Sequence, residues 1–181
     1  MEFDFFQVDA FSSRPFRGNP AAVVPLTTWL PDDQLLNIAA ENNLSETAFF
    51  MAHDDPSAIE LRWFTPAAEV ALCGHATLAT AHVLFAEKKL PVDELRFETR
   101  SVGPLIVRRS DAAYTMDFPA QPAIQDSDLD AVVAAVGQTP QALFKGYKWM
   151  VVMADESAVR AVKPDMTKLA RLDCEGLIVT S

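Results

Sequence analysis

Apolar and polar residues alternate in short runs through most of the chain, and longer stretches between these runs have helical spacing. Short runs rich in Val, Ile and Phe are typical of β-strands, whereas apolar residues repeated every three or four positions are typical of helices. The pattern predicts strands over residues 2–9, 21–26, 47–52, 58–65, 93–100, 104–109 and 113–118, and helices over residues 32–43 and 74–89.

The pattern changes after Phe118, where Pro119 and Pro122 lie among acidic and polar residues. Prolines and polar clusters interrupt regular elements, so we place a boundary there between a first domain, residues 1–118, and a second, residues 119–181. The second part is predicted to contain a helix over residues 127–136, a strand near 147–153, helical turns between 156 and 172 and a final strand over 176–181. A part of this size is small for an independent core, so either it packs on the first domain or sequence is missing.

Composition and charge exclude several classes of function. Half of the 181 residues are hydrophobic, and 15 basic against 25 acidic residues give a net charge of -10. Such a charge repels nucleic-acid phosphates and anionic lipid surfaces. The acidic start has no signal-peptide pattern, and no apolar stretch is long enough to span a membrane. We therefore expect a cytoplasmic protein that binds neither nucleic acid nor membrane.

Metal and cofactor sites are not indicated. Cys73 and Cys174 are far apart and form no CxxC pair, and the three histidines are too scattered for a ligand cluster. GxGxxG, GxxxxGK, GxSxG and HExxH patterns are all absent. We expect no disulfide, no metal and no nucleotide or pyridoxal cofactor.

The first candidate for chemistry is Glu46, in the segment NNLSETAFF between a predicted helix and a predicted strand. Ala48, Phe49 and Phe50 follow it closely. Apolar surroundings favour the neutral form of a carboxyl group and so suit it to proton transfer. The alternative is an ordinary helix-to-strand turn in which Glu46 faces water.

The second candidate is the segment CGHATLATAHVLF, in which Gly74 and His75 open an apolar helix. The first amides of a helix have no intrahelical acceptor and lie at the positive end of its dipole, so they suit a carboxylate. His75 would then be an acid, a base or a hydrogen-bond donor. Alternatively, Gly74 is a turn residue and His75 fills the first turn. Cys73 is either a reactive thiol, because a helix N-terminus lowers thiol pKa values, or a small buried residue.

The third candidate is a turn formed by Gly18, Asn19 and Pro20 between the first two predicted strands. The Asn19 side-chain amide would donate a hydrogen bond to a ligand oxygen. The alternative is a purely structural turn.

Four segments, taken in order, resemble the PhzF-like family: VDAFSSRPFRGNPAAVV, LSETAFF, LRWFTPAAEVALCGHATLATAHVL and FPAQP. The resemblance covers essentially all of the chain, as the amino-terminal part of a family member. It implies an α+β fold of the diaminopimelate-epimerase type, in which a curled, mostly antiparallel sheet surrounds a central helix. A second such domain would be incomplete here. In the family, the active site lies in the cleft between the two domains.

Carried over residue by residue, the resemblance implies that Glu46 is the catalytic acid or base and that His75 is the histidine of the family's GH motif. Gly74 and His75 would offer backbone amides to a substrate carboxylate, and Asn19 would line the site. The family's EDPVTGS motif is absent from this sequence. We therefore expect either a fragment of an enzyme or a natural truncation.

Three functions are open at this point. The first is a cofactor-independent isomerase or epimerase that moves a proton on a small carboxylate-bearing substrate. The second is a truncated, non-catalytic domain that binds an anion or a protein partner. The third is an epimerase that uses Cys73, but Cys174 does not lie in the partner motif that a two-thiol mechanism requires. The substrate is not identified, and a homodimer is left open.

Overall fold

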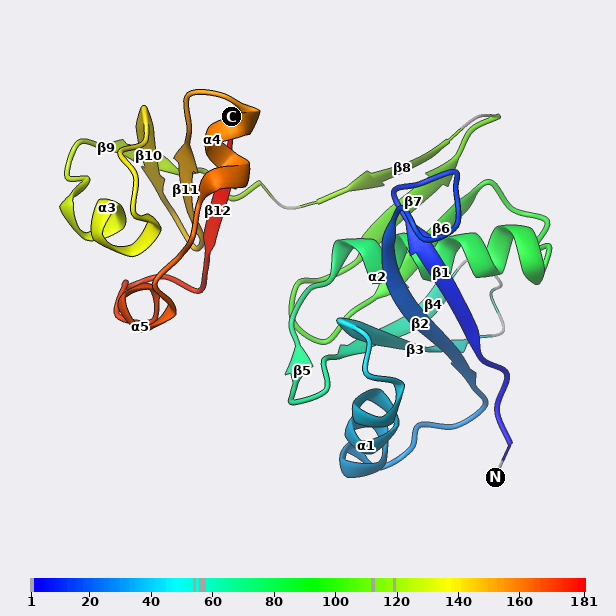
Figure 1. Ribbon diagram of the computed structural model, residues 1–181. Helices are drawn as coiled ribbons and strands as arrows, with labels where there is room; N and C mark the ends of the chain where they lie inside the picture. The colour runs from blue at the N-terminus through cyan, green and yellow to red at the C-terminus, as the bar shows by residue number, and fades with distance from the viewer. Residues whose placement is uncertain (1, 54, 56–57, 112, 119) are drawn as a thin grey trace. The chain divides into compact units, whose positions relative to one another are not determined.

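The computed structural model describes residues 2–53, 55, 58–111, 113–118 and 120–181. The chain folds into two compact units, residues 1–119 and 120–181 (Figure 1). In chain order, the first unit contains β1 (Phe6–Ala10), β2 (Asn19–Leu26), α1 (Asp32–Asn42), β3 (Glu46–Ala52), β4 (Ala58–Phe64), β5 (Glu69–Val70), α2 (Gly74–His82), the π-helical segment η1 (Val83–Glu87), β6 (Glu94–Glu98), β7 (Leu105–Arg109) and β8 (Tyr114–Asp117).

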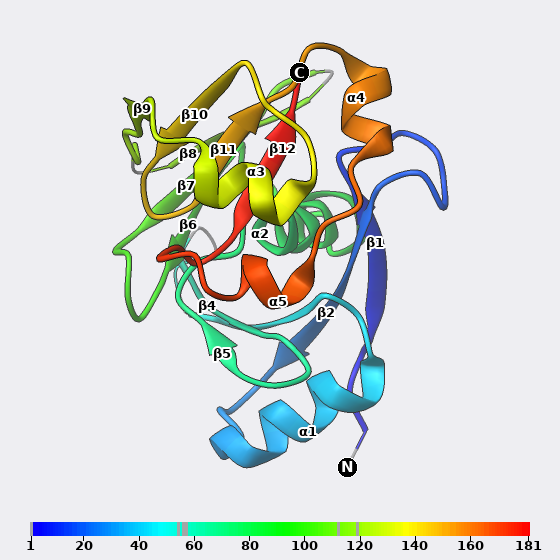
Figure 2. The ribbon, with the colours of Figure 1, turned by 60° about the vertical axis from the view of Figure 1, so that its left-hand side comes forward.

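The strands of the first unit form one mixed sheet in the order β1-β2-β3-β4-β6-β7-β8, with β5 paired to β4. The β2–β3 and β4–β6 pairs are parallel, and the other pairs are antiparallel. The sheet curves around α2, which lies inside the curve (Figures 1 and 2). The α+β prediction, with a curled and mostly antiparallel sheet around a central helix, is confirmed.

Side-chain alternation along the strands divides the apolar residues between two cores. On β3, Ala48 and Phe50 face the core that contains α2, whereas Phe49 faces the core that contains α1. On β4, Trp63 faces α2 and Phe64 faces α1. This period of two follows from strand geometry, and it means that any residue of these strands can be assigned to one face of the sheet.

The central helix is buried on nearly every side, which its composition permits. Most of its buried residues are small: Ala76, Ala79 and Ala81 are at most 1% exposed. The hydroxyls of Thr77 and Thr80 donate to the carbonyls of Cys73 and Ala76, four residues earlier, at 2.6 and 2.8 Å. Buried polar groups therefore have partners within the helix itself.

The second unit is a smaller α+β layer with its own apolar core. It contains β9 (Ile124–Asp126), α3 (Asp130–Val136), β10 (Ala142–Lys145), β11 (Trp149–Val152), α4 (Glu156–Ala161), α5 (Met166–Leu169) and β12 (Leu177–Thr180). Its sheet has the order β12-β11-β10-β9, in which only the β11–β12 pair is parallel among the described strands. Val132, Val136, Leu143, Val151 and Met153 form the buried core of this unit.

Several predicted elements need correction. The helix predicted over residues 127–136 begins only at Asp130, because the carboxylates of Asp126 and Asp128 accept backbone hydrogen bonds two residues ahead and hold turns there. The helix predicted over residues 74–89 ends as the π-helical η1 at Glu87. The pattern did not predict β5, β9 or β10, which are short. In the part of the chain that the structure describes, no helix combines the length and hydrophobicity needed to cross a membrane.

Candidate active site

Glu46 lies at the start of β3, on the sheet face that looks toward α2. It is two residues from Ala48, which belongs to the core around α2, and alternate strand residues share a face. The parallel pairing of β2 with β3 places Glu46 opposite Ala21. Its side chain is 21% exposed. Glu46 is therefore at the edge of the apolar core and keeps access to solvent.

His75 is the second residue of α2 and meets Glu46 directly. Its Nε2 atom is 3.4 Å from Oε2 of Glu46. The same nitrogen is 3.3 Å from the Ser45 hydroxyl, and Nδ1 is 3.4 Å from the Cys73 sulfur. The His75 side chain is 9% exposed. Two candidates from separate segments thus form one cluster, which we call the Glu46–Cys73–His75 cluster.

Burial determines the protonation state of the two inner members of this cluster. Burial lowers the pKa of His75, although the Glu46 carboxylate and the Pro20 carbonyl favour its charged form. Burial also raises the pKa of Cys73 to about 12, and the Glu46 carboxylate adds to this, whereas the nearby Ala76 and His75 amides oppose it. At neutral pH the imidazole and the thiol are therefore both neutral.

The neutral thiol of Cys73 can donate either to Nδ1 of His75, 3.4 Å away, or to the Glu46 carboxylate, with which it also forms a hydrogen bond. When the thiol donates to Nδ1, the ring proton lies on Nε2. Nε2–H then points to the carboxylate of Glu46 and the hydroxyl of Ser45. Ser45 in turn lies 3.5 Å from the carbonyl oxygen of Pro20. The result is a chain of polar contacts that holds the imidazole of His75 beside Glu46.

The thiol of Cys73 is not prepared for nucleophilic or basic catalysis. A helix N-terminus does favour a thiolate, and the adjacent amides act in that direction. Burial is the larger effect here, because the Cys73 residue is only 6% exposed. Of the two interpretations of Cys73, the structure supports the small buried residue.

Gly74 and Asn19 border the cluster without joining its hydrogen bonds. Gly74 is the first residue of α2 and is half-buried, so its amide belongs to the helix end that has no intrahelical acceptor. Asn19 is exposed at the start of β2, next to Pro20. Gly18 holds this turn close to β1, since a Cβ atom there would lie 2.3 Å from the carbonyl oxygen of Ala10.

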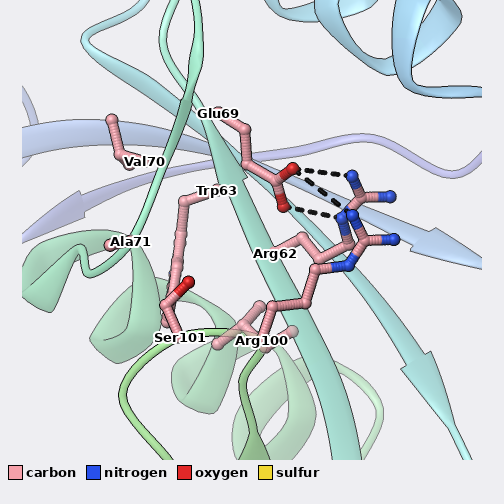
Figure 3. A pocket seen from close by; sticks show the side chains of 8 residues that line it. Arg62, Trp63, Glu69, Val70, Ala71, Arg100 and Ser101 are labelled. Atoms are coloured by element: carbon pink, nitrogen blue, oxygen red, sulfur yellow. Dashed lines mark hydrogen bonds and ion pairs between the residues drawn. The ribbon is translucent and has the colours of Figure 1, made fainter.

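A separate pocket beside β4 and β5 is held by internal ion pairs. Arg62 donates to both carboxylate oxygens of Glu69 at 2.8 Å, and Arg100 approaches Glu69 at 3.5 Å (Figure 3). Arg62 also donates to Asp32 at 2.7 Å. Two buried donors have no partner among the described residues: Nη1 of Arg62 and Nε1 of Trp63. Both residues line this pocket, but its charged groups are already paired with one another, Arg62 with Asp32 and Glu69, and Arg100 with Glu69. We therefore assign chemistry to the Glu46–Cys73–His75 cluster.

Sequence reasoning singled out Glu46 and His75 but missed Ser45 and the carbonyl of Pro20 as their neighbours. Ser45 directly precedes Glu46 in the SETAF segment, so its position was a usable signal. No sequence signal marked the Pro20 carbonyl, because its position depends on the pairing of β2 with β3.

The comparisons with known proteins cover nearly all of the chain. Residues 8–181 match the family PhzC-PhzF, described as phenazine biosynthesis-like protein. Two proteins of Pseudomonas aeruginosa, each named an uncharacterized isomerase, are 48% and 49% identical over 100% of this chain, which covers 69% of each. These names support the expectation that the chain is an isomerase.

Solved structures of similar fold include a PhzF-family protein, in agreement with the family match. A PhzF-family protein of Enterococcus faecalis has a TM-score of 0.89 and 42% identity, covering 99% of this chain and 68% of that one. A predicted epimerase of Pseudomonas aeruginosa shares the fold with a TM-score of 0.72 at 20% identity, over 98% of this chain and 70% of that one. The predicted diaminopimelate-epimerase-like fold is thereby confirmed. The chain belongs to the PhzC-PhzF family of phenazine biosynthesis-like proteins.

Proposed function

We propose that this protein is a cofactor-independent isomerase that moves a proton between carbon atoms of a small carboxylate-bearing substrate. Glu46 is the acid and base, and His75 supports it. The observation that carries this proposal is the contact between a partly exposed carboxylate and a buried imidazole, 3.4 Å apart, at the first turn of α2. Relatives named as isomerases support the same reaction class.

The reaction is balanced within the substrate and Glu46. The Glu46 carboxylate takes a proton from a carbon atom, the carbon–hydrogen bond breaks, and its electron pair delocalises into the substrate. Protonated Glu46 then returns the proton to another carbon, or to the other face of the same carbon. No atom is gained or lost and no oxidation occurs, so the cycle requires no co-reactant.

The start of α2 supplies the stabilising groups. The amides of Gly74 and His75 are expected to hold the substrate carboxylate, because a helix N-terminus favours negative charge. Hydrogen bonds directed at developing charge are worth more in a partly dry site than in water. Contacts of Nδ1 with the Cys73 sulfur and of Nε2 with Glu46 and Ser45 hold the His75 ring in one orientation. Asn19, exposed at the neighbouring turn, is a candidate for a further contact with the substrate.

A ligand screen followed by an isomerisation assay tests the proposal. Small amino, hydroxy and unsaturated carboxylic acids are added to the protein, and its thermal unfolding is recorded. A ligand at about a hundred times its dissociation constant stabilises the folded state by about 2.7 kcal/mol. Each stabilising acid is then incubated with the protein and followed by NMR. Isomerisation of one of them supports the proposal, and binding without any isomerisation would favour a non-catalytic anion-binding domain instead.

A further inference from the structure

The fold brings a carboxylate to a thiol and an imidazole that are near neighbours in the sequence. Cys73 directly precedes α2, His75 is the second residue of α2, and Glu46 is the first residue of β3. One ligand atom from each of the three lies within 4.8 Å of the other two. The spacing of histidines and cysteines along the sequence predicts no metal site, because a carboxylate from another element is visible only in the fold.

One of the ligand–ligand distances already suits a tetrahedral metal ion, and all three ligand atoms lie within 4.8 Å of one another. With zinc bonds of about 2.3 Å to sulfur and about 2.0–2.2 Å to nitrogen and oxygen, tetrahedral ligand atoms lie roughly 3.4–3.6 Å apart. The Cys73 sulfur is 3.4 Å from Nδ1 of His75, which matches this spacing, whereas the 3.4 Å contact of Oε2 of Glu46 is with the other ring nitrogen, Nε2. A metal ion binds only one nitrogen of an imidazole ring. The flexible Glu46 side chain must therefore move so that its carboxylate and the Cys73 sulfur reach the same metal ion.

The protein holds two of the three ligands in place. Cys73 and His75 are buried, and the hydroxyl of Thr77 donates to the Cys73 carbonyl at 2.6 Å. Glu46 is partly exposed, which leaves an approach from solvent, and a water molecule would be the fourth ligand. Three protein ligands with one open position is a common arrangement for zinc.

From this geometry we infer that Glu46, Cys73 and His75 form a binding site for a thiophilic divalent metal ion such as Zn²⁺ or Co²⁺. Binding exchanges the thiol proton for a metal–sulfur bond and releases that proton to solvent, with no change of oxidation state. The metal is not a cofactor of the proposed reaction. It occupies the carboxylate and imidazole that the reaction uses, so it acts as an inhibitor.

Cobalt spectroscopy tests the site directly. Co²⁺ is titrated into the protein with its thiols kept reduced, and the near-ultraviolet thiolate-to-cobalt charge-transfer band and the visible bands are recorded. We expect one Co²⁺ per chain and displacement by Zn²⁺. Cys73→Ser should lose the charge-transfer band, and its affinity should fall by more than about 100-fold, beyond the 10–100-fold effect typical of groups that only support a ligand.

Two further variants make the test specific. Glu46→Gln removes a partly exposed ligand with little effect on packing, and it should weaken binding at least about tenfold while the charge-transfer band remains. Cys174→Ser is the matched control, since Cys174 lies in the second unit, and it should bind as the wild type does. Absence of the band in wild type, or a band that survives in Cys73→Ser and disappears in Cys174→Ser, would overturn the inference.

The expected inhibition rests on the proposed function, whereas metal binding does not. The two claims can therefore fail separately. If Co²⁺ binds in the expected way but proton transfer continues at saturating metal, the metal site stands and the role of Glu46 is wrong. If no charge-transfer band forms while Glu46→Gln still abolishes proton transfer, the metal site is wrong and the proposed function stands.

Discussion

Oε2 of Glu46 and Nε2 of His75 lie 3.4 Å apart, although the two residues belong to different elements, β3 and α2. Because β3 pairs with β2 and α2 lies inside the curve of the sheet, this contact depends on the tertiary fold of the first unit. Neither residue could be held there by local structure alone. The contact therefore links the stability of the fold to the chemistry of the site.

The pKa of His75 should lie below its ordinary value of about 6.5, because the ring is buried. NMR titration of the ring protons measures it. The Glu46 carboxylate favours the charged ring, so Glu46→Gln should lower the pKa of His75 further. Glu41→Gln, at an exposed position of α1, should leave it unchanged. An increase in the Glu46→Gln protein would contradict the described contact.

The lowered pKa of His75 makes the free energy of unfolding depend on pH. In the unfolded chain His75 takes up a proton near pH 6.5, whereas the folded protein resists protonation down to its lower pKa. The contribution of His75 to the free energy of unfolding is thus fully present above about pH 6.5 and is lost as the pH falls from there through the folded-state pKa. Urea unfolding at several pH values should show this loss in wild type and a smaller one in His75→Asn. Equal losses in both proteins would exclude His75 as the cause.

The two cysteines should react at very different rates with a disulfide reagent such as DTNB at pH 8. Cys73 is buried and its pKa is about 12, so almost none of it is thiolate. Cys174 is partly exposed. The Cys174 thiol should react quickly, and the Cys73 thiol should react only after unfolding. The Cys174→Ser variant should lose the fast reaction. Rapid reaction of Cys73 would restore the thiol-based alternative.

Arg62 should contribute strongly to stability. Its buried guanidinium binds Asp32 and Glu69 and lies over the ring of Trp29. Arg62→Ala should lower the free energy of unfolding clearly, because it removes a buried side chain that packs on Trp29 and donates hydrogen bonds to the more exposed carboxylates of Asp32 and Glu69. Arg96→Ala is the control, since Arg96 is exposed and pairs only with exposed Glu98 among the described residues, and it should have little effect. Similar losses in the two variants would contradict this role.

Gly18→Ala should destabilise the first unit. The new Cβ atom would lie 2.3 Å from the carbonyl oxygen of Ala10, and backbone must move to relieve this contact. We expect a loss of about 1–3 kcal/mol, measured by urea unfolding. Gly176→Ala, where a Cβ atom meets nothing within 4 Å, should be nearly neutral. A neutral Gly18→Ala would show that the turn before Asn19 is freer than described.

Much of the first unit could be predicted from the sequence, because its strands bury one or both faces and so have strong apolar patterns. β5 was missed since two residues show no periodicity, and β9 was missed since Ile124 and Gln125 are exposed. The candidate residues Glu46 and His75 were found by motif and by position at element ends. The protonation state of Cys73 could not be predicted from the sequence. It depends on the balance between a helix end and burial, and burial is a tertiary property.

The most direct test of the account is solvent deuterium exchange by the wild type, Glu46→Gln and Glu41→Gln. A carboxylic acid that the wild type isomerises is incubated with each protein in D₂O, and deuterium in its carbon skeleton is followed by NMR. If Glu46 carries the proton, deuterium enters with wild type and Glu41→Gln, and the rate falls by roughly a hundredfold or more with Glu46→Gln, while the acid still stabilises that variant against unfolding. Exchange by Glu46→Gln at the wild-type rate would contradict the central claim.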